Sequence, residues 1–330
     1  MEESRRKEAA NAGKLVILTG PTAVGKTALS VALAKKIGGE IISADSMQVY
    51  RGMDIGSAKV TAEEMQGIPH FLIDEFDPAE EFHVVRFQEY AKRYIREIQE
   101  RGHIPILVGG TGFYIQSVLY DIDFTENGSD HSYREELETL AKEHGAEYLH
   151  TMLASVDPAS AEAIHANNVK RVIRALEFYR ETGERISEHN EEERRKASPY
   201  QFAYFVLNDA RDRIYANIDC RVDLMLEHGL VEEVRRLQAQ GCTRDMVSMQ
   251  GLGYKEILDY LDGRCSYEEA VRVLKRDTRH FAKRQLTWFK RERQTDWISM
   301  DDRSEEAILS EIEAIMRKRM ITPGRTDGRA

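Results

Sequence analysis

The sequence Gly20-Pro-Thr-Ala-Val-Gly-Lys-Thr27 is a complete G-x-x-x-x-G-K-[ST] phosphate-binding loop. An apolar, β-branched run at residues 14–19 precedes it, and an alanine-rich stretch with helical periodicity follows at 27–36. This order lets backbone N–H groups converge on an anion at the positive end of a helix dipole. The loop predicts a diphosphate or polyphosphate ligand, with the lysine on the terminal phosphate and the Thr27 hydroxyl on Mg²⁺. The residues assigned to it are Gly20, Pro21, Thr22, Ala23, Val24, Gly25, Lys26 and Thr27.

Further strands alternate with helices downstream of the loop. Glu40-Ile-Ile-Ser-Ala-Asp45 and Ile104-Pro-Ile-Leu-Val-Gly-Gly110 have strand composition, with a helical stretch at 87–101 between them. Such alternation predicts an α/β fold of the P-loop NTPase type, a parallel sheet covered by helices on both faces. Ligands of these sheets collect at the carboxyl ends of the strands. The phosphate loop, residues 45–50 and residues 109–114 are therefore expected around one crevice.

The composition changes between residues 121 and 200. Strand-like runs vanish, and charged helical segments appear at 133–144, 159–166 and 169–182, with a charge-rich run at 188–196 that we interpret as a solvated connector. A strand resumes at 201–207, and a long helix follows at 211–227. We therefore expect a core formed by residues 1–122 and 201–330, interrupted by an all-helical insertion at 123–200.

Two polar residues follow predicted strands at the expected crevice. Asp45 has three possible roles: general base, outer-sphere magnesium ligand or helix cap, the commonest job of an aspartate in this position. The neighbouring Ser46, Gln48 and Tyr50 add hydrogen-bonding groups, which favours a functional role. Thr111 follows two glycines, where backbone can approach a ligand closely, but the turn could equally just begin the next helix.

Charge is unevenly distributed along the chain. The net charge is −10, yet residues 271–293 contain nine lysines and arginines against two acidic residues, with aromatic residues between them. Such a cationic stretch in an acidic protein indicates a polyanion-binding surface, although the aromatic side chains by themselves favour core packing. Three cysteines without metal spacing suggest a reducing, cytoplasmic compartment, and neither a signal peptide nor a membrane-spanning run is expected.

Six motifs occur in an order that resembles the tRNA dimethylallyltransferase (tRNA isopentenyltransferase) family. They are the phosphate loop, Asp45-Ser-Met-Gln-Val-Tyr50, Gly109-Gly-Thr-Gly-Phe-Tyr114, Arg174-Ala-Leu-Glu177, Gln250-Gly-Leu-Gly-Tyr254 and Ala282-Lys-Arg-Gln-Leu-Thr-Trp288. The resemblance implies transfer of a dimethylallyl group from dimethylallyl diphosphate to the exocyclic amine of the adenine just 3′ of the anticodon. The carboxyl-terminal Cys/His zinc motif of eukaryotic members is not found here, so the chain is similar to the bacterial form.

The resemblance also implies roles for individual residues. Asp45 and Thr111 would be catalytic, Arg221 would join the diphosphate site, Thr27 would bind Mg²⁺, and the insertion would contact tRNA. Residues implied to face the tRNA are Asp45, Ser46, Met47, Gln48, Thr111, Lys170, Arg171, Val172, Ile173, Arg174, Met249, Gln250, Gly251, Leu252, Gly253, Tyr254, Lys283, Arg284, Gln285, Leu286, Thr287, Trp288, Phe289 and Lys290. We expect tRNA and dimethylallyl diphosphate as partners, and a monomer.

Three alternatives to this function are compatible with part of the sequence. A small-molecule kinase shares the loop and the sheet but has no use for the basic stretch. An adenylate isopentenyltransferase applies the same chemistry to a free nucleotide. A non-catalytic RNA-binding protein would leave the phosphate loop and Asp45 without a role.

Overall fold

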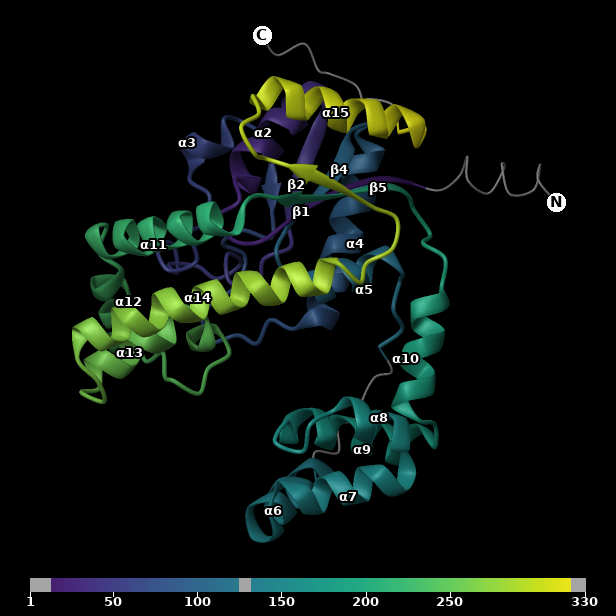
Figure 1. Cartoon of the computed structure of the whole chain (residues 1–330), viewed down its shortest axis with the longest axis vertical. Coiled ribbons are helices and arrows are strands. Elements are labelled where there is room, and N and C mark those ends of the chain that lie inside the picture. The colour runs from purple at the N-terminus through teal and green to yellow at the C-terminus, as the bar shows by residue number, and fades with distance from the viewer. Residues whose placement is uncertain (1–12, 125–131, 322–330) are drawn as a thin grey trace, which may run out of the picture. The chain divides into compact units, whose positions relative to one another are not determined.

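The computed structural model describes residues 13–124 and 132–321, and its chain divides into two compact units (Figure 1). The larger unit comprises Met1–Leu119 and Pro199–Ala330, and the smaller one Tyr120–Ser198.

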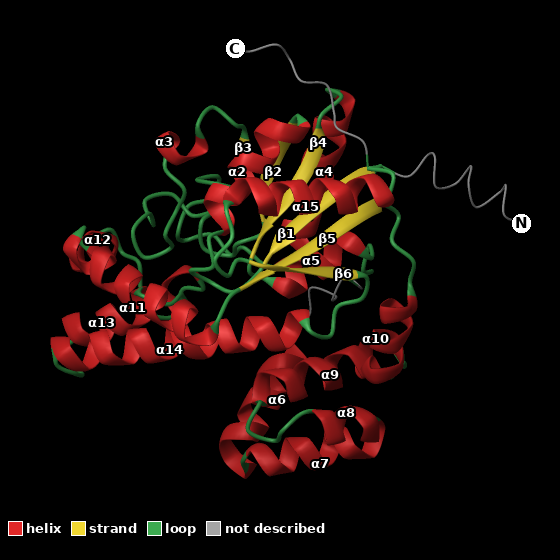
Figure 2. Ribbon diagram, turned by 45° about the horizontal axis from the view of Figure 1, so that its top comes forward, coloured by secondary structure: helices red, strands yellow, loops and turns green. Residues whose placement is uncertain are grey.

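A six-stranded, fully parallel sheet forms the centre of the larger unit (Figure 2). Its strands are β1 (Lys14–Thr19), β2 (Gly39–Ser43), β3 (His70–Phe71), β4 (Ile104–Gly109), β5 (Gln201–Asn208) and β6 (Thr295–Ser299), in the order β3-β2-β4-β1-β5-β6. The predicted parallel sheet is thereby confirmed. Thr19 pairs with Gly109 on one side and Val206 on the other, so the carboxyl ends of three strands lie level.

Helices cover both faces of the sheet, and the inner strands bury apolar side chains beneath them. Residues 15–18 of β1 are all 0% exposed. Val16 and Leu18 pack with buried residues of α2 (Lys26–Ile37) and α15 (Glu305–Lys318). The helices α4 (Val84–Glu100) and α5 (Gly112–Leu119) pack against each other, and α4 packs on β2 and β4 (Figures 1 and 2). Each fully buried aliphatic side chain contributes about 1.5–3 kcal/mol to folding, and this double burial holds the strand ends in place.

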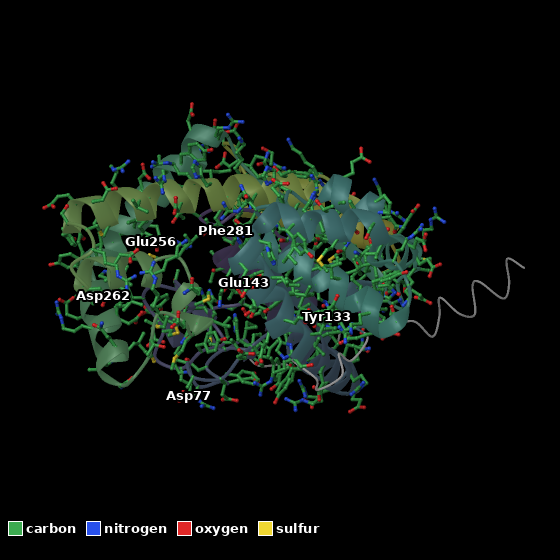
Figure 3. The ribbon with its side chains drawn as sticks, turned by 90° about the horizontal axis from the view of Figure 1, so that it is seen from below. Asp77, Tyr133, Glu143, Glu256, Asp262 and Phe281 are labelled. Atoms are coloured by element: carbon green, nitrogen blue, oxygen red, sulfur yellow. The ribbon has the colours of Figure 1, made fainter. Side chains whose placement is uncertain are left out.

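The remaining helices of the larger unit lie after β2 and after β5. They are α3 (Ala62–Met65), α11 (Arg211–Glu227), α12 (Leu230–Ala239), the 3₁₀ turn η1 (Ser248–Gln250), α13 (Tyr254–Leu261) and α14 (Tyr267–Phe289). Figure 3 labels Glu256 on α13 and Phe281 on α14, two helices that pack against each other. The basic helix predicted at 271–293 ends at Phe289, so Arg291 and Arg293 lie beyond it. Among the described residues, no helix has the length and apolar composition needed to cross a membrane.

The smaller unit is helical and has a core of its own. It consists of α6 (Ser132–His144), α7 (Ala146–Val156), α8 (Pro158–Ala163), α9 (Val169–Thr182) and α10 (Ile186–Arg195). Leu149, Leu153 and Val172 are 0% exposed in its core. The interpretation of residues 188–196 as a connector is wrong, because most of them belong to α10. Buried Asp157 accepts hydrogen bonds from the Ser187 amide and hydroxyl at 3.0 and 2.7 Å, which fixes the start of that helix.

A buried carboxylate supports the chain that follows the Asp45 turn. The side chain of Glu233 in α12 is 3% exposed and accepts hydrogen bonds from the backbone amides of residues 54–56 at 2.9–3.1 Å. The Tyr254 hydroxyl donates to the same carboxylate at 2.8 Å. Removal of this carboxylate would leave three amide donors without their side-chain acceptor.

We therefore expect Glu233→Leu to lower the free energy of unfolding by about 3 kcal/mol, because buried donors left without acceptors cost about 1–3 kcal/mol each and are not additive. Urea unfolding followed by circular dichroism measures the change. Glu232→Leu is the matched control, since its exposed carboxylate pairs with Arg235 at 3.6 Å. Equal losses of stability for the two variants would contradict the role given to Glu233.

Candidate functional site

The phosphate loop connects β1 to α2 in a conformation that needs its glycines. Gly20 has φ 150°, and a Cβ there would lie 2.5 Å from the Leu207 carbonyl oxygen. Gly25 has φ 95° and precedes the first residue of α2. Lys26 Nζ donates to the carbonyls of Gly20 and Pro21 at 3.0 and 2.8 Å. The lysine therefore lies over its own loop, at the amino-terminal end of a twelve-residue helix.

Three charged side chains interact electrostatically at this edge of the sheet. Burial and the neighbouring Arg221 charge lower the pKa of Lys26 to about 7, and Asp45 opposes the shift. Burial likewise lowers the pKa of Arg221, against the opposing influence of Glu64 and Asp45. Two partly buried cations that repel each other near the partly buried carboxylate of Asp45 favour a bound anion. Lys26, Asp45, Thr111 and Arg221 are called the strand-end site below.

Asp45 follows β2, and its two oxygens differ in their surroundings. Oδ1 accepts from the backbone amides of Met47 at 2.8 Å and Gln48 at 3.4 Å, which caps the turn after the strand. Oδ2 accepts no hydrogen bond from any other described residue. Burial raises the pKa of Asp45, and the two turn amides, Lys26 and Arg221 oppose that rise. The capping role foreseen for this aspartate is thus present, and it leaves one oxygen for chemistry.

Gln48 is held by the protein and is not free to bind a base. Its Nε2 donates to the Ala58 carbonyl at 3.0 Å, and its Oε1 accepts from the Ser43 hydroxyl at 3.4 Å. Gln48 therefore positions the Asp45 turn, and its contact with tRNA stays a prediction, as do those of Asp45, Ser46 and Met47.

Thr111 lies in the short connection between β4 and α5. Its amide donates to the Ala44 carbonyl at 3.2 Å, which ties it to the residue before Asp45. Its carbonyl accepts from the amides of Tyr114 and Ile115, so Thr111 also begins the helix. The side chain is partly exposed, and its hydroxyl donates no hydrogen bond to a described residue.

The glycines around Thr111 allow other residues of the protein to approach closely, and they also leave room for a ligand. A Cβ at Gly109 would lie 2.2 Å from the Ala44 carbonyl oxygen, and one at Gly112 would lie 2.2 Å from Trp288 Cδ1. At Gly110 the nearest atom is Gln285 Nε2, at 2.1 Å. The explanation of these glycines by ligand approach alone is incomplete, because the Ala44 backbone lies directly against Gly109 and side chains of α14 lie against Gly110 and Gly112.

The cations of α14 fall into two groups. In its amino-terminal half each cation is paired with a carboxylate: Arg272 with Glu269, Lys275 with Asp223, Arg276 with Asp277 and Arg279 with Asp219. In the carboxyl-terminal half Lys283 and Arg284 are exposed, as is Arg291 just beyond the helix, and no described carboxylate lies within 4.0 Å of these three. These three, with His280, Thr287 and Trp288, line an open hollow of about 410 Å³. The predicted polyanion surface is therefore concentrated in residues 280–291.

Several residues predicted to face tRNA have buried side chains. Val172 and Ile173 belong to the core of the smaller unit. Met249, Tyr254 and Phe289 are each 0% exposed. A Cβ at Gly251 would lie 2.4 Å from Met47 Cε, so the 249–254 motif packs against the Asp45 turn. The exposed or partly exposed members are Asp45, Ser46, Met47, Gln48, Thr111, Lys170, Arg171, Arg174, Gln250, Gly251, Leu252, Lys283, Arg284, Leu286, Thr287, Trp288 and Lys290.

A metal ion would bind here through few protein ligands. Residues 13–124 and 132–321 contain no cluster of three or more His, Cys, Asp or Glu side chains suited to a metal. Thr27, at the start of α2, has a partly exposed side chain and lies next to Lys26. This donor set suits an ion that is held mainly by a phosphate ligand and water, as Mg²⁺ commonly is.

Comparison with known proteins agrees with this geometry. The family model described as IPP transferase matches residues 48–292. A protein of Lachnoclostridium phytofermentans named tRNA dimethylallyltransferase is 64% identical over 308 residues, covering 93% of this chain and 98% of that protein. The crystal structure of the tRNA isopentenylpyrophosphate transferase of Bacillus halodurans is similar with a TM-score of 0.72 at 47% identity, covering 93% of this chain and 97% of the other. A eukaryotic dimethylallyltransferase acting on tRNA gives a TM-score of 0.80 at 29% identity, covering 96% and 82%.

Proposed function

The chain belongs to the IPP transferase family, and from this premise we propose that it is a tRNA dimethylallyltransferase. It transfers the dimethylallyl group of dimethylallyl diphosphate to N6 of the adenine 3′-adjacent to the anticodon, which yields N6-isopentenyladenine and diphosphate. The observation that carries this proposal is the strand-end site, where two cations lie beside a carboxylate whose pKa is raised. The leaving diphosphate needs positive charge to stabilise it, and the attacking amine needs a base nearby to accept its proton.

The donor half of the reaction uses the phosphate loop. As the allylic C–O bond breaks, its electron pair passes to the diphosphate, and Lys26, Arg221 and the loop amides stabilise that charge. If Mg²⁺ accompanies the diphosphate, the Thr27 hydroxyl is the ligand that this chain offers, and the ion supplies further charge neutralisation.

The acceptor half uses the Asp45 turn and Thr111. Adenine N6 is a weak nucleophile, and it becomes acidic as the new C–N bond forms. Asp45 Oδ2 accepts the proton that N6 loses, which makes Asp45 the general base. Thr111 and Ser46 orient the adenine, which has to leave its stack to reach the strand ends. The helical smaller unit and the exposed part of α14 hold the rest of the tRNA, and we expect a monomer acting in the cytoplasm, where tRNA resides.

A prenyl-transfer assay tests this function. Purified protein is incubated with radiolabelled dimethylallyl diphosphate and either unmodified tRNA or AMP, and the label in each acceptor is counted. We expect label in tRNA alone. Transfer to AMP would favour an adenylate isopentenyltransferase, and turnover of ATP without tRNA would favour a kinase. Mass analysis of tRNA from cells lacking the protein should show loss of a prenyl group on adenine.

The exposed cations of α14 give a prediction for tRNA affinity. Lys283→Ala and Arg284→Ala should each weaken tRNA binding and flatten its dependence on salt. The slope of log K against log [salt] should fall by about 1 for each phosphate that the protein no longer neutralises. Filter binding at several salt concentrations measures this slope.

Arg272→Ala is the control on the same helix, because Glu269 already neutralises that arginine at 2.6 Å. Its slope should equal that of the wild type. Unchanged slopes for Lys283→Ala and Arg284→Ala would place the tRNA elsewhere on the protein.

A further inference from the structure

One glutamine connects the two loops that flank the strand-end site. Gln285 of α14 is 5% exposed. Its Oε1 accepts from the Thr22 amide of the phosphate loop at 2.9 Å, and its Nε2 donates to the Gly110 carbonyl at 3.0 Å. A single planar amide thus joins the diphosphate side to the Thr111 side.

The phosphate loop has a strained residue next to this contact. Ala23 has φ 64°, a left-handed conformation that is unfavourable for a non-glycine residue. Gln285 holds the amide of the residue before it, and Asn217 of α11 donates to the Ala23 carbonyl at 3.3 Å. The strained alanine is therefore bracketed by side-chain amides from two helices, and it also packs against Ile214, Ile218 and Ala282.

The space around Gln285 is fitted to its side chain. Gly110 could not carry a Cβ without meeting Gln285 Nε2 at 2.1 Å. The neighbouring Arg284 and Thr287 are exposed, whereas Gln285 points into the protein. Both ends of its buried amide have a protein partner, Thr22 and Gly110, so this side chain has a role within the protein besides the contact with tRNA that the family resemblance implies.

We propose that Gln285 is a positioning residue that holds the phosphate loop in its diphosphate-binding shape and fixes its distance from Thr111. The inference rests on the proposed function for the identity of the ligand and on the two hydrogen bonds for the mechanism. Gln285 touches neither substrate. Its two hydrogen bonds also connect both reacting loops to α14, the helix that carries the exposed Lys283 and Arg284.

Gln285→Met tests the proposal by removing both hydrogen bonds at similar side-chain volume. We expect the Kd for inorganic diphosphate, measured by calorimetry without tRNA, to rise by about 10- to 100-fold, since the loop amide and carbonyl lose their buried partners. Hydrogen exchange of the Thr22 amide should accelerate. Gln238→Met is the control: an exposed glutamine whose side chain bonds Asp262 should leave diphosphate affinity and loop exchange unchanged.

Gln285→Glu gives a signature that a purely structural role would not produce. The ionised carboxylate still accepts from Thr22 but faces the Gly110 carbonyl oxygen without a proton. The protonated form restores both bonds. The ratio of variant to wild-type diphosphate affinity should therefore approach one as the pH falls, while the ratio for Gln285→Met stays constant.

Two outcomes separate this inference from the proposed function. If wild-type protein binds no diphosphate, the proposed function is overturned. Exchange of the Thr22 amide still shows whether Gln285 holds the phosphate loop. If wild-type protein binds diphosphate and a folded Gln285→Met variant, checked by its melting curve, binds it equally well with unchanged exchange, then Gln285 does not position the loop.

Discussion

Asp45→Asn is expected to lower kcat for tRNA prenylation by about 10²–10⁴-fold, the usual cost of losing a general base. Asparagine keeps an oxygen that can accept from the Met47 amide, as Oδ1 does at 2.8 Å, so the turn after β2 should survive. It cannot take a proton at neutral pH. Single-turnover prenylation with saturating tRNA and donor isolates this step from binding.

The pH profile gives a second expectation for Asp45. Burial raises the pKa of this carboxyl, so its basic form is lost as the pH falls through a value above the ordinary one. The wild-type rate should decline on the acid side, and the residual rate of Asp45→Asn should lack that limb. Asparagine does not titrate. The pH dependence that disappears in this variant is therefore the contribution of Asp45 to the chemical step.

Asp45→Ala completes the comparison, because it removes the cap as well as the base. Loss of a cap costs about 1 kcal/mol, so the alanine variant should melt earlier than the asparagine variant at a similar rate. If excess Mg²⁺ restored the rate of Asp45→Asn, the aspartate would be a metal ligand instead. Wild-type activity in a folded Asp45→Asn protein would refute the proposed mechanism.

The fold was largely predictable because most of its strands can be identified by their own apolar composition. β1, β4 and β5 are mainly apolar runs, as buried parallel strands tend to be, and β2 contributes the apolar pair Ile41 and Ile42. β6 was missed because Asp296 and the exposed Trp297 interrupt its apolar pattern, and β3 because it has only two residues. α10 was missed because its sequence, Ile186–Arg195, is almost entirely polar. Hydrophobic periodicity cannot reveal a helix that has almost no apolar residues.

The candidate site was predictable where a local sequence motif determines the conformation of a single loop. Residues 20–27 and the Asp45 turn are local motifs, and their sequence identifies them. Glu233 and Gln285 act on residues far away in the sequence, at separations of 179 and 263 residues. No local pattern distinguishes Glu233 from its exposed neighbour Glu232. The division of the α14 cations into paired and unpaired groups likewise cannot be read from the sequence, because the partners Asp219 and Asp223 belong to α11.

The second large effect concerns Lys26. Lys26→Ala should lower kcat by about 10²–10³-fold, as loss of one stabilising group at a charged transition state commonly does. It should also weaken binding of inorganic diphosphate, whereas tRNA affinity should stay unchanged. Prenyl-transfer kinetics, diphosphate calorimetry and filter binding measure the three quantities. Lys36→Ala serves as the control, because that lysine lies in the last turn of the same helix and pairs with Glu313 at 3.5 Å.

Proton uptake gives the sharpest test of Lys26. Its pKa in the free protein is about 7, so most Lys26 side chains are neutral at pH 8. A bound diphosphate raises that pKa, so binding at pH 8 should draw up to one proton from the buffer, and affinity should fall as the pH rises above 7. Calorimetry in buffers of different ionisation enthalpy counts the proton. Lys26→Arg, which keeps its charge at this pH, should bind without uptake. Uptake that persisted in both Lys26→Ala and Lys26→Arg would assign the proton to another group and remove Lys26 from the diphosphate site.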